Sequence, residues 1–182
     1  MKKYFVTMSL LTACLFFAGT AAASFYIGPE LGKFKPKFEY DILGGIRFEG
    51  SSAFQWGAKA GIKLLMFAIE GNYLSSSHSL TPALWGDRGL NISYLGVNGK
   101  IYFPILVVQP YVTAGYGYYT VEKEGSEKDS NGGYNFGGGV EIALGKIHLF
   151  GEARYHQVTV QIGDADLVAK GWGLTFGANF HL

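Results

Sequence analysis

The chain ends on the stretch Thr175-Phe176-Gly177-Ala178-Asn179-Phe180-His181-Leu182, in which apolar and polar residues alternate to the last position. The apolar set begins at Trp172 and continues through Leu174 with the same spacing of two. A period of two places these side chains on one face of a β-strand, with Gly, Thr, Asn and His on the other. Because chain termini usually fray, a fully amphipathic strand at the end of a chain is unusual for a soluble protein.

The same period of two recurs along the chain in segments of about ten residues, which is typical of transmembrane β-strands. No apolar run after Ala23 is long enough to cross a bilayer as a helix, and the 3.6-residue period of amphipathic helices is missing. We predict eight strands: Phe25–Phe34, Phe54–Ile62, Phe67–Leu74, Ser93–Phe103, Val107–Val121, Tyr134–Ala143, Ile147–Val158 and Gly171–Leu182.

The connections between the predicted strands alternate in length. Residues 63–66, 104–106 and 144–146 are short turns, whereas 35–53, 75–92, 122–133 and 161–170 are longer loops. Short periplasmic turns and longer outer loops are the arrangement of outer-membrane barrels. The strand-like segment Ile42–Phe48 is interpreted as part of a hairpin in the first outer loop, with a ninth strand as the alternative, because single-chain bacterial barrels have even strand counts.

The N-terminal residues predict export. Lys2 and Lys3 precede an apolar stretch, and Ala21-Ala22-Ala23 provides a small-residue cleavage site before Ser24. This pattern indicates a signal peptide over residues 1–23 and a barrel domain over residues 24–182. The alternatives are an uncleaved membrane anchor and a lipoprotein cleavage box at Leu11-Thr12-Ala13-Cys14, where apolar residues follow the cysteine instead of a polar tether.

Composition narrows the function classes. Cleavage would remove the one cysteine, so no disulfide is expected, and would remove Lys2 and Lys3 but no acidic residue, changing the formal charge from +1 to about −1. This charge argues against nucleic acid as a partner. Glycine (27 residues) and aromatic residues (16%) are abundant, which suits curved strands and a membrane interface.

Outward-facing aromatic residues are sorted by height if the strands run up and down. Four phenylalanines, Phe25, Phe67, Phe103 and Phe180, fall near the periplasmic end. An aromatic girdle near the outer end is predicted at Trp56, Tyr73, Tyr118, Tyr134, Tyr155 and Trp172. Trp and Tyr favour the membrane–water boundary because each has an apolar and a polar side. A soluble lipocalin-like barrel, apolar inside and charged outside, is the alternative that periodicity alone leaves open.

Three further stretches carry a family resemblance: Gln109–Tyr118, Gly137–Glu141 and Glu152–Tyr155. Together with a C-terminal assembly signal at Gly177, Phe180 and Leu182, they resemble the outer-membrane β-barrel superfamily that includes the outer-membrane protein A barrel and opacity-type surface proteins. The resemblance implies an all-β, eight-stranded, antiparallel up-and-down transmembrane barrel in the outer membrane of a Gram-negative bacterium. It also implies lipopolysaccharide and other outer-membrane lipids and the barrel-assembly machinery as partners, and a monomer.

An eight-stranded barrel leaves just enough interior space for side chains to fill. Ionisable residues predicted to point inward are nearly balanced in charge, and unpaired buried charge is costly, so we expect an ion-pair network that fills the lumen. Its predicted members are Glu30, Lys59, Glu70, Lys100, Glu141, Glu152 and Arg154, accompanied by His148 and His156.

Catalytic and cofactor signals are weak. Candidates for a lipid A-modifying enzyme are His78, Ser79, Asp87 and His156, but no His-x-Ser motif of the deacylase type is present. Four scattered histidines lack metal-ligand spacing, and Gly137-Gly138-Gly139 lies within a strand, so no metal or cofactor is predicted. The sequence therefore predicts a non-enzymatic protein with a structural or surface-interaction role carried by its loops, with a narrow or gated channel as the alternative.

Overall fold

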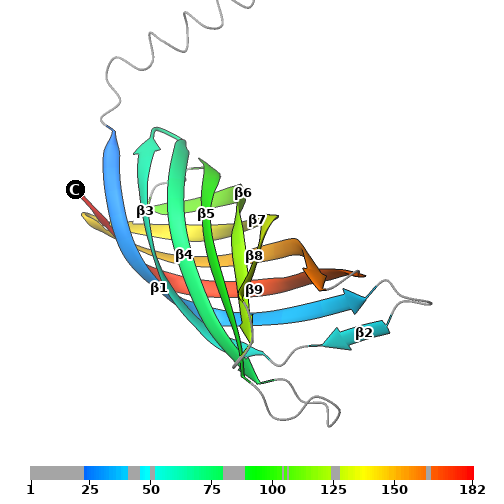
Figure 1. The fold of residues 1–182 in the computed structure, drawn as a ribbon. Coiled ribbons are helices and arrows are strands. Elements are labelled where there is room, and N and C mark those ends of the chain that lie inside the picture. Colours follow the sequence, from blue (N-terminus) through cyan, green and yellow to red (C-terminus); the bar gives the residue numbers. More distant parts are fainter. Residues whose placement is uncertain are drawn as a thin grey trace, which may run out of the picture.

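The computed structural model describes residues 23–40, 46–49, 52–79, 89–103, 105, 107–123, 128–162 and 165–182 (Figure 1). The strands in these ranges are β1 (Ser24–Tyr40), β2 (Ile46–Glu49), β3 (Ala53–Leu64), β4 (Phe67–Ser79), β5 (Gly89–Tyr102), β6 (Val108–Lys123), β7 (Lys128–Leu144), β8 (Ile147–Ile162) and β9 (Ala165–His181). Among the described residues, no helix is long and apolar enough to span a membrane. The predicted signal peptide lies outside the described residues except for Ala23.

Eight of these strands close into a barrel. Each pairs antiparallel with the next in the order β1-β3-β4-β5-β6-β7-β8-β9, and β9 pairs back with β1. Within the described chain β2 pairs with β1 alone, from Lys37 opposite Glu49 to Tyr40 opposite Ile46. It therefore forms a hairpin arm at the end of β1 (Figure 1), and the predicted eight-stranded up-and-down barrel is confirmed.

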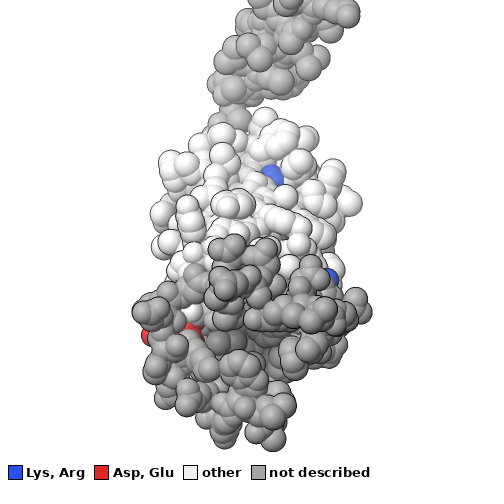
Figure 2. Space-filling model, turned by 45° about the vertical axis from the view of Figure 1, so that its right-hand side comes forward, with Lys and Arg blue, Asp and Glu red and all other residues white. Residues whose placement is uncertain are grey.

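The two faces of the barrel have opposite chemistry. On the outside, 55% of Trp172 and 45% of Phe180 are exposed, whereas Glu152 and Arg154 on the inside are only 4% and 3% exposed. The described part of the outer surface is a broad band with few charges in the view of Figure 2. An apolar exterior and a polar interior are the arrangement that a bilayer selects, so the lipocalin-like alternative is excluded.

The strands extend further than the sequence predicts at one end. We call the end with the short connections 65–66, 103–107 and 145–146 the turn end, and the opposite end the loop end. At the loop end β1 continues to Tyr40 instead of Phe34, and β8 and β9 leave only residues 163–164 between them instead of 161–170. Main-chain pairing continues here although the outer face of β1 carries Lys33, Lys35 and Lys37 instead of apolar residues, so the alternation that marks a membrane strand is lost before the strand ends.

The barrel closes along the seam between β1 and β9. Phe180 lies opposite Ile27, and the main-chain nitrogen of Leu182 donates to the carbonyl oxygen of Phe25 at 2.8 Å. Gly177 lies opposite Glu30, and a Cβ atom at this position would collide with the carbonyl oxygen of Pro29 and lie 2.7 Å from Cζ of Phe150. Closure therefore requires a residue without a side chain at position 177.

Gly177→Val is expected to reduce the fraction of protein that folds, because the valine side chain separates β1 from β9. The measurement is the share of membrane-extracted protein whose gel mobility changes on boiling. Gly71→Val is the matched control, since the nearest atoms to a Cβ there are 3.9 and 4.0 Å away on the outer face. Equal folded fractions for the two variants would contradict the assigned seam.

Candidate functional site: a charged network in the barrel lumen

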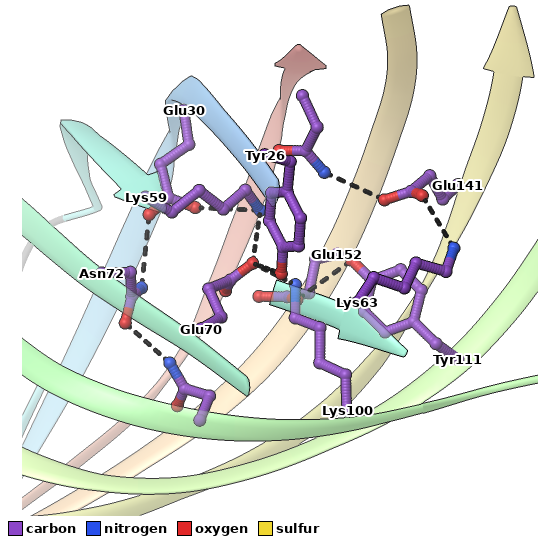
Figure 3. A network of polar contacts seen from close by, with 12 residues as sticks. Tyr26, Glu30, Lys59, Lys63, Glu70, Asn72, Lys100, Tyr111, Glu141 and Glu152 are labelled. Carbon is purple, nitrogen blue, oxygen red and sulfur yellow. Dashed lines mark hydrogen bonds and ion pairs between the residues drawn. The ribbon is translucent and has the colours of Figure 1, made fainter. Parts of the chain in front are cut away.

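Six charged side chains meet in the middle of the lumen, three acidic and three basic. They are Glu30 on β1, Lys59 on β3, Glu70 on β4, Lys100 on β5, and Glu152 and Arg154 on β8, and all are buried. Figure 3 shows Lys59 and Lys100 converging on Glu70. The network therefore has no net formal charge, and its members come from five of the eight barrel strands.

Glu70 is the centre of this network. Its carboxylate lies 2.8 Å from Nζ of Lys100, 3.8 Å from Nζ of Lys59 and 3.7 Å from Nη2 of Arg154. Lys59 Nζ also lies 3.6 Å from Glu30 Oε2. On the other side, Lys100 Nζ lies 3.3 Å from Glu152 Oε2, and Arg154 pairs with Glu152 directly. Each charge in the group thus faces at least one opposite charge, which is the condition for keeping charges in a dry interior.

Neutral side chains complete the network. Tyr26 donates a hydrogen bond to Glu70 at 2.9 Å, and Tyr111 donates one to Glu152 at 3.0 Å. Asn72 donates to Glu30 at 3.2 Å. Lys59 Nζ, in addition, lies 3.2 Å from the centre of the Phe150 ring, a cation–π geometry. The sequence reasoning missed the tyrosines as network members. Their positions in the alternating pattern, on the inward face of their strands, could have identified them.

Glycines give the long charged side chains room to cross the lumen. Directly opposite Lys59 across the β1–β3 pair is Gly28, opposite Glu70 is Gly61, and opposite Glu152 is Gly139. Some ion pairs join residues that are offset along neighbouring strands, such as Lys100 and Glu70, whose direct partners are Ala68 and Asn98. Others cross the lumen, such as that between Lys100 on β5 and Glu152 on β8. The high glycine content therefore serves the packing of the lumen.

Glu141, the seventh predicted member, lies apart from the central group, toward the turn end. Its Oε1 atom lies 3.3 Å from Nζ of Lys63 and 2.8 Å from Nδ1 of His148, while Oε2 accepts from Asn179 at 2.9 Å. Lys63 also donates to Gln109 (Figure 3 shows Lys63 reaching toward Glu141). Of this second cluster, the sequence reasoning named Glu141 and His148 but missed Lys63.

Toward the loop end the described part of the lumen contains histidine and aromatic groups. His156 and Tyr119 share a hydrogen bond of 2.8 Å, and the rings of His78 and His156 lie 5.9 and 5.5 Å from that of Phe34. A cavity of about 20 Å³ remains there, enough for about one water molecule. Of the remaining enzyme candidates, Asp87 and the side chain of Ser79 lie outside the described residues.

The predicted girdle residues lie on the outer face, and some of them contact each other across strands. Trp56 packs edge-on against Tyr73 with ring centres 6.1 Å apart, and Tyr155 packs against Trp172 at 5.4 Å. Tyr118 and Tyr134 are exposed on the same face. In the C-terminal motif, Phe180 and Leu182 are exposed. Their roles at the membrane boundary and in assembly stay predictions.

Comparison with known proteins identifies the architecture. The family described as "outer membrane protein beta-barrel domain" matches residues 7–180. No curated protein matches the chain in sequence. Similar solved structures are Neisserial surface protein A (19% identity, 87% of this chain and 98% of that one, TM-score 0.68), the outer membrane protein OprG from Pseudomonas aeruginosa (12%, 91% and 98%, 0.62) and the outer membrane protease OmpT from Escherichia coli (8%, 91% and 100%, 0.52).

Removal of one charge from the central network is expected to destabilise the barrel strongly. Lys100→Met leaves Glu70 and Glu152 short of a partner, and breaking a buried pair in this way costs about 3–5 kcal/mol. The measurement is urea-induced unfolding of the protein in lipid vesicles.

The double variant Lys100→Met/Glu152→Gln restores charge balance and is expected to lose less stability than Lys100→Met alone. Lys146→Met, at an exposed turn position, serves as the control, with an expected change within about 0.5 kcal/mol. A Lys100→Met barrel as stable as this control would show that the network contributes nothing to stability.

Proposed function

The chain belongs to the family of outer membrane protein beta-barrel domains, and we propose that it is a non-enzymatic surface protein whose barrel is a closed scaffold. As an integral protein of the Gram-negative outer membrane, it would present its connections at the loop end to the exterior, where function usually lies on such scaffolds. The filled lumen carries this proposal. It rests on the network around Glu70 and not on the likeness to other barrels, because one fold can serve many functions.

The central network argues against an open pore. Glu30 and Glu70 are wholly buried, and Lys59 and Lys100 are 2% exposed, in the middle of the lumen. An ion that crossed the barrel would have to separate Lys100 from Glu70, whose atoms are 2.8 Å apart, and would leave both charges uncompensated in a narrow space. The second candidate is a gated channel. It would require the charged residues of the central network to exchange partners so that a path for ions opens.

The serine–histidine pair at the loop end, Ser76 with His78, is arranged against catalysis. Ser76 Oγ lies 3.0 Å from His78 Nε2, but the hydroxyl donates to the carbonyl oxygen of Ile92 at 3.3 Å. The serine oxygen must then accept a hydrogen bond from Nε2 of His78, whereas a nucleophilic serine donates its hydrogen bond to a basic histidine nitrogen. Both side chains are also buried inside the barrel, away from the lipid that a lipid A-modifying enzyme would have to reach.

Three lysines support lipopolysaccharide as a lipid partner. Lys33, Lys35 and Lys37 are exposed on the outer face of β1, in its loop-end half. Lys35 lies opposite Trp172 in the β1–β9 pair, at the height of the predicted aromatic girdle. A row of ammonium groups at the level of the headgroups favours anionic lipid phosphates, by about 1 kcal/mol for each lysine.

The barrel-assembly machinery is the second proposed partner, and it would act on the C-terminal motif during insertion.

Purified protein in planar lipid bilayers is expected to give no steady single-channel steps, because the network closes the lumen. A general porin measured in the same bilayers provides the positive control for insertion and recording. Reproducible unitary steps that survive repeated purification would refute the closed scaffold and establish the gated channel.

The triple variant Lys33→Gln/Lys35→Gln/Lys37→Gln is expected to bind lipopolysaccharide at least about tenfold more weakly than the unaltered protein, since it loses three cations near the lipid phosphates. Binding is measured with fluorescent lipopolysaccharide added to the protein in neutral detergent. Lys146→Gln, at the turn end, is the control and should bind like the unaltered protein. If the triple variant and the unaltered protein bind lipopolysaccharide with equal affinity, these three lysines do not bind the lipid.

A further inference from the structure

Three potential metal ligands meet at the turn end of the lumen. Glu141 comes from β7, His148 from β8 and His181 from β9, which are consecutive neighbours in the barrel. Their ligand atoms all lie within 4.8 Å of one another. Glu141 Oε1 is 2.8 Å from His148 Nδ1 and 4.0 Å from His181 Nε2. One carboxylate and two imidazoles form a donor set that zinc accepts in proteins.

The second nitrogen of each histidine has a partner that orients its ring. His148 Nε2 lies 3.2 Å from the carbonyl oxygen of Gly145, which can only accept, so Nε2 donates there. Nδ1 faces the Glu141 carboxylate, which likewise can only accept, and a bound metal would replace the hydrogen bond between them. His181 Nδ1 lies 2.7 Å from Ser24 Oγ, which leaves Nε2 directed at the cluster. Metal-bound histidines in proteins are held by the same kind of outer contact.

His181 provides an independent observation that points to a ligand. Its side chain is 10% exposed, and its Nε2 atom is buried without a hydrogen-bond partner. An unsatisfied buried nitrogen is costly, and one that faces a carboxylate and a second imidazole would be satisfied by a cation. The main chain fixes this position, because the nitrogen of His181 donates to the carbonyl oxygen of Lys146 in the β7–β8 turn at 2.8 Å.

We propose that Glu141, His148 and His181 form a zinc-binding site at the turn end of the barrel, with water completing the coordination. In a tetrahedral zinc site, ligand atoms about 2.0–2.1 Å from the metal are roughly 3.3 Å apart. The observed separations of 2.8 and 4.0 Å bracket this value. The rings of His148 and His181, whose centres lie 3.8 Å apart, would have to turn so that a nitrogen of each faces the metal. In outer-membrane barrels the short turns face the periplasm, and the site would therefore take zinc from that compartment.

Lys63 competes with the metal. Its Nζ atom lies 3.3 Å from the same Oε1 atom of Glu141 and 3.7 Å from the centre of the Tyr102 ring. An ammonium group and Zn²⁺ repel each other at this distance, so zinc must displace Lys63 toward the barrel opening, where 12% of its side chain is already exposed. The lysine therefore weakens zinc binding at this site, and its removal should strengthen that binding. Zinc bound loosely by histidines elsewhere on the surface would not respond to Lys63.

The test is titration of the detergent-purified, chelator-treated protein with Zn²⁺ in a calorimeter, and with Co²⁺ as a spectroscopic substitute. We expect one Zn²⁺ per chain, and visible cobalt bands that zinc abolishes. His148→Gln and His181→Gln should each weaken zinc binding by more than about tenfold. A tenfold loss is the lower limit for removing a residue that only contacts a ligand, and removal of a ligand itself should cost more. Lys63→Gln should instead strengthen it.

His78→Gln is the matched control, because His78 is a buried histidine in the lumen near the opposite end. It should leave zinc affinity unchanged. All variants are first checked for the change in gel mobility on boiling, so that only folded barrels are compared. Failure of the unaltered protein to bind zinc, equal affinity in His181→Gln, or weaker binding in Lys63→Gln would each overturn the proposal.

Discussion

Charge pairing inside a narrow barrel is the constraint on which the rest of this structure depends. An eight-stranded barrel has room for side chains and little else, so an ionisable residue that points inward must find a partner there. Glu70 meets this demand with Lys59, Lys100, Arg154 and the hydroxyl of Tyr26. These partners come from four different strands, so the ring must be closed before the carboxylate is fully compensated.

This requirement gives the ion pairs a role beyond stability, namely in the pairing register. A slip of one residue between two strands would place charges in the lipid, and the alternation of faces forbids it. A slip of two residues would preserve the alternation, but it would bring long side chains against each other where glycines now lie: Gly28 is opposite Lys59, and a slip would place Tyr26 or Glu30 there instead. The packing of long charged side chains opposite glycines therefore favours one register among those that the apolar face permits.

The sequence predicted the faces well and the contacts poorly, for a physical reason. Parity along each strand was enough to place Glu30, Lys59 and Arg154 in the lumen, because a period of two is a local property. Which of them meet depends on the stagger between strands and on the closure between β1 and β9, neither of which is local. The separation of Glu141 from the central group was invisible for this reason, as were the hydroxyl contacts of Tyr26 and Tyr111.

The histidines show the same limit most clearly. Judged by distance along the chain, His148 and His181 are unrelated, and the absence of a metal site was predicted on that ground. The antiparallel return of β9 beside β8 brings their ring centres to 3.8 Å, so that ground no longer holds. The network around Glu70 lies between this turn-end cluster and the histidines near the loop end. Because that network is buried and neutral, a cation bound beside Glu141 would be separated from the loop end, and each end of the barrel could serve its own compartment independently.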